Sequence, residues 1–156
     1  MTKQKLTLRP LEARDRAAWD EMWQAYIVFY KASVPDEVTE KTWARILAPS
    51  FHEEGGGFIG LVALDAAGQA AGFVHALLHL STWSIAPVCY IEDLFVRPDV
   101  RGSGAGRALL EAIAGMGRAQ GWGGCYWKTA DDNYPGRTLY DKVARRTTWI
   151  VYEKDL

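Results

Sequence analysis

The sequence is poor in cysteine. Among its 156 residues only Cys89 and Cys125 are cysteines, and neither has a Cys or His partner at metal-ligand spacing. Both lie in apolar, strand-like runs, so we expect buried free thiols, no disulfide and no metal site. This thiol content favours a reducing, cytoplasmic compartment.

Long apolar runs and an excess of charge are also missing. No run approaches the roughly 18 apolar residues of a membrane span, and the polar residues 1–5 lead straight into a strand pattern without a signal-peptide core. We therefore expect no export and no membrane partner. Eighteen Lys and Arg residues face nineteen Asp and Glu residues, a formal net charge of -1. No global basic field attracts nucleic acid, so we expect no nucleic-acid partner and only local polyanion sites.

What is present fits one α/β domain spanning residues 1–156. The hydrophobic share of 49% and charged share of 24% are typical of a globular protein of this length. Apolar periodicity and Gly/Pro punctuation predict strands at 5–11, 58–64, 71–80, 88–96, 125–129 and 148–152. They predict helices beginning near 12, 36, 105 and 134, with Val38, Trp43, Ile46 and Leu47 turned inward in the second.

A glycine-rich segment follows the expected strand 88–96. Gly102, Gly104 and Gly106 alternate at the mouth of a helix that starts near Ala105. Glycines let a ligand approach the backbone closely, and a helix start offers unpaired N–H groups and partial positive charge. Nearby cations come from Arg97, Arg101 and Arg107. The pattern predicts a pyrophosphate site, although the same glycines would also serve a tight strand-to-helix turn.

Two other phosphate loops do not fit this segment. It lacks the Gly-Lys-Ser/Thr ending of a P-loop. A dinucleotide fingerprint belongs to an early strand-turn-helix unit, whereas this segment lies two-thirds along the chain.

The segment resembles the acetyl-CoA signature of the GNAT superfamily of N-acyltransferases, Arg/Gln-x-x-Gly-x-Gly/Ala, with Arg101, Gly104 and Gly106 at the matching positions. Its flanks are similar too: residues 90–98 resemble the preceding strand, and Asn133 with Leu139-Tyr140 resembles the superfamily's Asn…Leu-Tyr element. Arg9-Pro10-Leu11 with Asp15 resembles its N-terminal opening. The chain is most similar to the branch that holds diamine acetyltransferases and fungal Hpa-type enzymes, which acetylate histone lysines, polyamines or amino acids.

The resemblance implies a mixed, mostly antiparallel central sheet flanked by helices, with a splayed pair of strands holding acetyl-CoA and no metal. It implies direct attack of an amine on the thioester. Cofactor contacts would come from Leu94, Phe95, Val96, Arg101, Gly102, Ser103, Gly104, Ala105, Gly106, Arg107 and Asn133. Many members carry Gly-Phe where this chain has Val143-Ala144-Arg145-Arg146, which bears on the acceptor side.

Two residues are the catalytic candidates. Glu92 would take a proton from the amine, since partial desolvation in an apolar strand raises a carboxyl pKa; the alternative is a structural carboxylate paired with an arginine. Asp93 is expected on the opposite strand face. Tyr140 would protonate the leaving thiolate; the alternative is a core tyrosine.

The acceptor is expected to be a small cationic amine, a polyamine or an amino acid. The acidic residues Glu92, Asp93, Asp131 and Asp132 would suit such a partner, or they are simply solvated surface. A protein lysine, a non-catalytic acyl-CoA sensor and a nucleotide-binding module are the alternatives. His75 and His79 read as structural or cleft-lining rather than metal ligands, and His52 lies in a polar loop. The resemblance also suggests a homodimer built on aromatic residues of the first helix and the last strand.

Overall fold

The central sheet is built from strands that pair in chain order. The computed structural model describes residues 5–48 and 56–156, so His52 lies outside the described residues. The sheet order is β1-β2-β3-β4-β5, with strands β1 (Thr7–Pro10), β2 (Gly57–Leu64), β3 (Ala70–Ser81), β4 (Ser84–Val96) and β5 (Gly124–Trp127). Neighbours are antiparallel except β4 and β5, which are parallel. The predicted mixed, mostly antiparallel sheet is confirmed.

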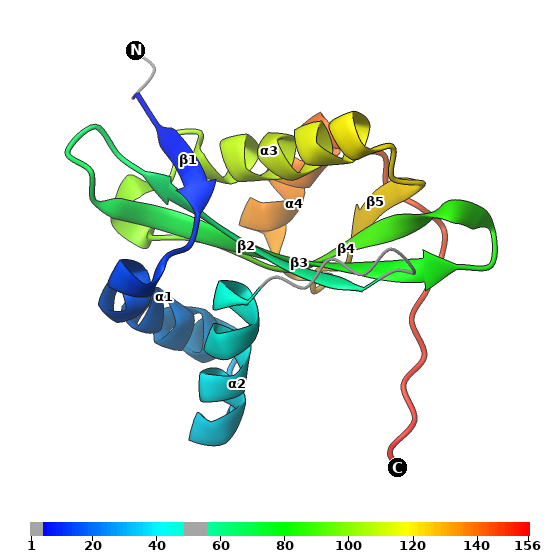
Figure 1. Cartoon of the computed structure of the whole chain (residues 1–156), viewed down its shortest axis with the longest axis horizontal. Helices are drawn as coiled ribbons and strands as arrows, with labels where there is room; N and C mark the ends of the chain where they lie inside the picture. Colours follow the sequence, from blue (N-terminus) through cyan, green and yellow to red (C-terminus); the bar gives the residue numbers. More distant parts are fainter. Residues whose placement is uncertain (1–4, 49–55) are drawn as a thin grey trace.

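Helices cover both faces of this sheet. A short 3-10 turn (Ala13–Asp15) leads into α1 (Arg16–Phe29), which with α2 (Asp36–Leu47) covers one face, while α3 (Ala105–Gln120) and α4 (Tyr134–Val143) lie on the other (Figure 1). Arg9 at the end of β1 donates to both carboxylate oxygens of Asp15, at 2.6 and 2.8 Å. This pair joins the first strand to the start of α1.

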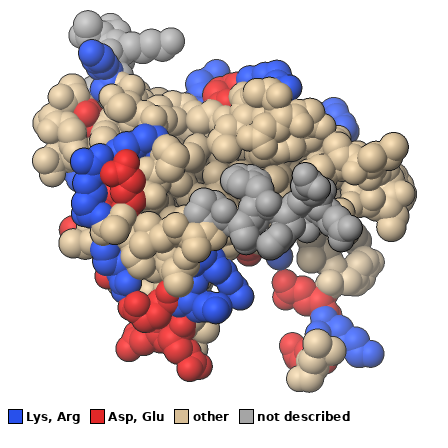
Figure 2. Space-filling view, viewed as in Figure 1, with Lys and Arg blue, Asp and Glu red and all other residues tan. Residues whose placement is uncertain are grey.

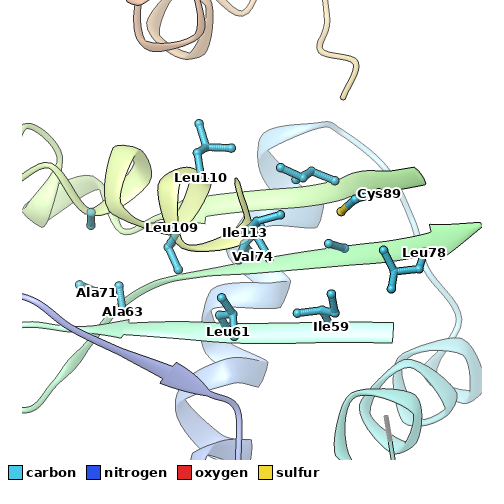
Figure 3. Close-up of a cluster of buried hydrophobic side chains, with 13 residues drawn as sticks. Ile59, Leu61, Ala63, Ala71, Val74, Leu78, Cys89, Leu109, Leu110 and Ile113 are labelled. Atoms are coloured by element: carbon cyan, nitrogen blue, oxygen red, sulfur yellow. The ribbon is translucent and has the colours of Figure 1, made fainter. Parts of the chain in front are cut away.

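Each face has its own apolar core. On one face Leu109 and Ile113 of α3 point toward Leu61 and Val74 of the sheet (Figure 3), and Leu110 belongs to the same buried cluster. On the other, the rings of Trp19 and Trp23 from α1 and Trp43 from α2 pack on Val62, Phe73 and Phe95. The buried residues of α1 and α3 recur at spacings of three and four, as expected for helices with one apolar face.

Some predicted burials are wrong. Val38 is 45% exposed and Leu47 is also exposed, because α2 packs on β2 with the face that carries Thr39, Trp43 and Ile46. Cys125 is exposed as well, whereas Cys89 is buried as expected. Cys125 lies on β5, the edge strand of the sheet, where burial depends on what covers the edge.

The predicted last strand at 148–152 is also wrong. This segment pairs with no strand of the described chain, and Trp149 to Tyr152 have exposed fractions between 63% and 86%. Alternating apolar residues predict strand conformation, but a strand forms only where a partner edge receives it.

Two irregularities in β4 shape the region around the glycine-rich segment. Pairing with β5 begins at Val88 and ends at Ile91, opposite Trp127, so the two strands part beyond that point. Pairing with β3 skips Glu92: His75 lies opposite Asp93 and Ala76 opposite Ile91. Glu92 is therefore the extra residue of a β-bulge, a feature common beside active sites.

Charges of both signs are interspersed on the face shown in Figure 2, with acidic side chains gathered at the first turn of α2, where Asp36 and Glu37 lie. Negative charge there complements the positive end of the helix dipole. Across residues 5–48 and 56–156, no helix combines the length and apolar character of a membrane crossing.

Candidate active site

A cavity of about 490 Å³ opens where β4 and β5 part. Its wall is made by the free edge of β4, the start of α3, α4 and the end of α1. Ten of the eleven predicted cofactor residues line it, namely Leu94, Phe95, Val96, Arg101, Gly102, Gly104, Ala105, Gly106, Arg107 and Asn133. Tyr140 lines it too. Ser103 and Glu92 are not among its lining residues.

The start of α3 forms the floor of the cavity. Gly102 and Gly104 have φ of 84° and 91°, a left-handed conformation that disfavours any side chain. Gly104 is the N-cap, so backbone N–H groups of the first turn point toward the cavity end of the helix. The Oγ of Ser103 accepts a hydrogen bond from the Ala105 N–H at 3.3 Å. The geometry fits an anion such as a pyrophosphate.

Cationic side chains surround this helix start. Arg101 and Arg107 line the cavity, and neither forms an ion pair with a carboxylate of the described chain. Lys142 of α4 adds a third cation that the sequence did not single out. Arg97, by contrast, is committed elsewhere: it binds Asp99 through two nitrogens at 3.0 and 2.5 Å and the Ala70 carbonyl at 2.9 Å.

Tyr140 is half-buried between the cavity and a smaller pocket that Trp127 and Lys128 also line. Its ring meets that of Trp127 edge to face, with centroids 5.5 Å apart. Burial, with a smaller contribution from Tyr30, raises the pKa of Tyr140 to about 12. The phenol is thus protonated at neutral pH and placed to donate a hydrogen bond into the cavity.

The two carboxylates of β4 do not alternate across the sheet, contrary to the prediction for Asp93. Ile91 and Leu94, three residues apart, both pack against the core on the α3 side, which only a bulge between them allows. Glu92 and Asp93 both act on the Tyr26 hydroxyl of α1, whose pKa is raised by burial and by both carboxylates. Burial and the neighbouring Asp93 raise the pKa of Glu92, against a smaller opposing effect of Lys128.

Asn133 lines the cavity but is engaged in the protein's own structure. Its Oδ1 accepts the Gly136 N–H at 3.2 Å and caps α4, and its Nδ2 donates to Thr129 Oγ1 at 2.9 Å. A cap of this kind fixes where the helix begins. Asn133 therefore sets the position of Tyr140, two turns along the same helix.

Sequence reasoning missed the aromatic wall of the cavity, which Tyr26, Phe29 and Tyr30 form at the end of α1. The Arg101 guanidinium lies 6.0 Å from the centre of the Phe29 ring. Phe29 and Tyr30 stay partly exposed at the end of α1. The only signal was this unusual density of aromatic residues at 26, 29 and 30.

The two described histidines differ. His75 is fully buried between Trp19 and Asp93. His79 is exposed, and its Nε2 lies 2.9 Å from the Tyr126 hydroxyl oxygen. In the described part of the chain, no three His, Cys, Asp or Glu residues are grouped to hold a metal ion.

Comparisons with known proteins agree with this geometry. The model of the acetyltransferase (GNAT) family matches residues 18–144. The D-amino-acid N-acetyltransferase HPA3 of Saccharomyces cerevisiae is 33% identical over 156 residues, covering 99% of this chain and 94% of the relative. A thialysine N-epsilon-acetyltransferase of Caenorhabditis elegans is 30% identical over 104 residues, covering 64% and 62%.

A solved structure shares the fold. AAC(6')-Iy in complex with the bisubstrate analogue CoA-S-monomethyl-acetylneamine superposes with a TM-score of 0.79 at 18% identity, covering 97% of this chain and 99% of that one. The arrangement of sheet and helices is therefore shared. The chain belongs to the acetyltransferase (GNAT) family and is an acetyl-CoA-dependent N-acetyltransferase.

Proposed function

We propose that this enzyme transfers the acetyl group of acetyl-CoA to the primary amine of a small cationic acceptor by direct attack. The observation that carries the proposal is the meeting of three features in one cavity: the glycine-rich start of α3, the unpaired edge of β4, and Tyr140. Glu92 and Asp93 directly precede the lining residue Leu94 on β4, and both carboxylates raise the pKa of Tyr26, which also lines the cavity.

The chain's own residues would hold acetyl-CoA as follows. Backbone N–H groups from Gly102 to Arg107 bind the pyrophosphate, with Arg101, Arg107 and Lys142 supplying counter-charge. Leu94, Phe95 and Val96 present a strand edge that can pair with the amide-bearing arm of the cofactor like an added strand. Bound there, acetyl-CoA supplies an activated acyl group as a thioester.

The acceptor must lose a proton before it attacks. An amine with a pKa of about 10.4 is neutral only about 0.04% of the time at pH 7, which adds roughly 4.6 kcal/mol to the barrier. Glu92 takes this proton, directly or through a water molecule. Its raised pKa makes it a stronger base than an ordinary glutamate.

Tyr140 stabilises the leaving group. Transfer of the proton from a phenol with a pKa of about 12 to a thiolate whose conjugate thiol has a pKa of about 8.5 would be uphill. Tyr140 therefore donates a hydrogen bond to the sulfur as negative charge develops on it.

The acceptor class is proposed from charge and from the relatives. Glu92 and Asp93 suit an ammonium group, and the matched relatives are named for D-amino acids and thialysine. Acetylation of free amines, namely D-lysine, thialysine and spermidine, should exceed acetylation of a lysine within a peptide by at least about tenfold in kcat/KM. Preference for the peptide would instead support a protein-lysine acetyltransferase.

We further propose that a second copy of the chain covers the C-terminal segment 148–152. Four consecutive apolar side chains lie exposed there, and β5 is a free sheet edge whose Cys125 and Tyr126 are also exposed. An exposed apolar strand and a free edge are complementary, since edge pairing satisfies both.

A further inference from the structure

We propose that Trp19 and His75 form a buried relay that holds the Asp93 carboxylate in place as the anchor for the ammonium group of the acceptor. The relay makes His75 a positioning residue for acceptor binding. This proposal rests on the proposed transfer of acetyl to a cationic amine. It identifies the residues that select the amine.

The relay is a continuous chain of hydrogen bonds across three elements. His75 on β3 lies opposite Asp93 on β4 in the strand register, and its Nδ1 is 2.9 Å from Asp93 Oδ2. On the other side of the ring, Trp19 Nε1 of α1 donates to His75 Nε2 at 2.9 Å. His75 is 0% exposed, whereas the Asp93 side chain keeps 12% of its surface exposed.

The tryptophan fixes which nitrogen of His75 carries the proton. An indole N–H can only donate, so His75 Nε2 must accept. The ring proton then lies on Nδ1, which donates to Asp93. A doubly protonated ring would direct an N–H at the N–H of Trp19. His75 therefore supports Asp93 as a neutral donor and leaves the negative charge of the carboxylate uncancelled.

The surroundings of His75 argue for this specific role. The rings of Trp19, Trp23, Phe58 and Phe73 all lie with centroids within 6.0 Å of the imidazole centroid. An apolar side chain would suit such a pocket better than a polar ring. The polar ring is needed because Asp93 lies next to it, and every buried polar side-chain atom of the described chain has a partner.

Asp93 connects the relay to the cavity. Tyr26 lines the cavity, and the Asp93 carboxylate raises the pKa of the Tyr26 hydroxyl. The bulge places Glu92 beside Asp93, and the positive charge of Lys128 acts on the Glu92 carboxylate. With Glu92 assigned to proton removal, Asp93 remains as the fixed negative charge that holds the acceptor.

The test compares His75→Phe, Asp93→Asn and the double variant, with His79→Phe on the same strand as the matched control. Losing a charge-assisted contact is expected to raise KM for a cationic amine at least about tenfold in both single variants, and no further in the double variant. KM for acetyl-CoA should stay within about twofold, because Asp93 is not among the residues that line the cofactor cavity. His79→Phe should leave both constants unchanged.

A merely structural His75 would lower the thermal unfolding temperature without raising KM for the amine selectively, and that result would overturn the relay. The relay would also be overturned if the increases in KM caused by His75→Phe and Asp93→Asn simply added in the double variant. A second measurement needs no variant: nitrogen NMR of the wild-type protein should show His75 as the Nδ1–H tautomer, and an Nε2–H tautomer would refute the assignment. Failure of the relay can be distinguished from failure of the proposed function, because in the second case the wild-type protein itself would acetylate none of the amines.

Discussion

At the scale of single residues, the bulge in β4 gives Glu92 and Asp93 different tasks. One extra residue between Ile91 and Leu94 brings both carboxylates toward Tyr26. A bulge depends on pairing with β3, and the local sequence contains no sign of it. This is why alternation placed Asp93 on the wrong face, while Tyr140 could be singled out from the Leu139-Tyr140 resemblance alone.

The raised pKa of Glu92 predicts how activity depends on pH. The ionised carboxylate is the active form, so kcat at saturating amine should fall as pH falls through the raised pKa, above the ordinary glutamate value of about 4.3. Glu92→Gln should lose this acid limb and lower kcat at neutral pH by about 10²-fold or more. Since Asp93 contributes to the shift, Asp93→Asn should move the limb to lower pH. An unchanged limb in Glu92→Gln would exclude Glu92 as the base.

At the scale of elements, the glycine-rich start of α3 was predicted closely. Gly102 and Gly104 have the left-handed φ that only glycine adopts readily, and α3 begins at Ala105 as expected. Local chemistry fixes this turn, so the sequence is sufficient to find it. The splay of β4 from β5, which opens the cavity, follows instead from where pairing stops at Trp127.

Gly104→Ala tests this helix start. The new methyl group would contact nothing within 4 Å, so the change acts through the strained φ of 91°, at a cost of about 1 kcal/mol, and through closer crowding of a bound phosphate. Isothermal titration should show weaker acetyl-CoA binding, by about tenfold. Gly115→Ala, in the middle of α3, is the control: it should leave binding unchanged and stabilise the helix by up to about 1 kcal/mol. Equal affinities of the two variants would contradict the pyrophosphate site.

The C-terminal segment shows the limit of sequence reasoning at this scale. Trp149, Ile150, Val151 and Tyr152 have the composition of a strand, yet no edge within the described chain receives them. Whether a strand finds a partner depends on how the other elements are arranged, and the five residues 148–152 do not show this arrangement.

At the scale of the whole molecule, the proposed cover for this segment predicts a dimer. Light scattering after size exclusion should give twice the chain mass of 17.4 kDa. Ile150→Lys would place a charge in the apolar contact and should shift the protein toward the monomer. Leu156→Lys at the exposed chain end is the control and should remain dimeric. A wild-type protein that is monomeric at high concentration would contradict the pairing. The cytoplasmic location stays a prediction from the sequence.

We propose that Tyr140 and the cavity it lines carry out acetyl transfer. The most direct measurement is thiol release from acetyl-CoA in the presence of a cationic amine, comparing wild type with Tyr140→Phe and with Tyr134→Phe on the exposed side of the same helix. Wild type and Tyr134→Phe should turn over alike, and Tyr140→Phe should lose about 10²-fold or more in kcat while binding acetyl-CoA normally. Undiminished turnover in Tyr140→Phe would contradict a role of Tyr140 in acetyl transfer.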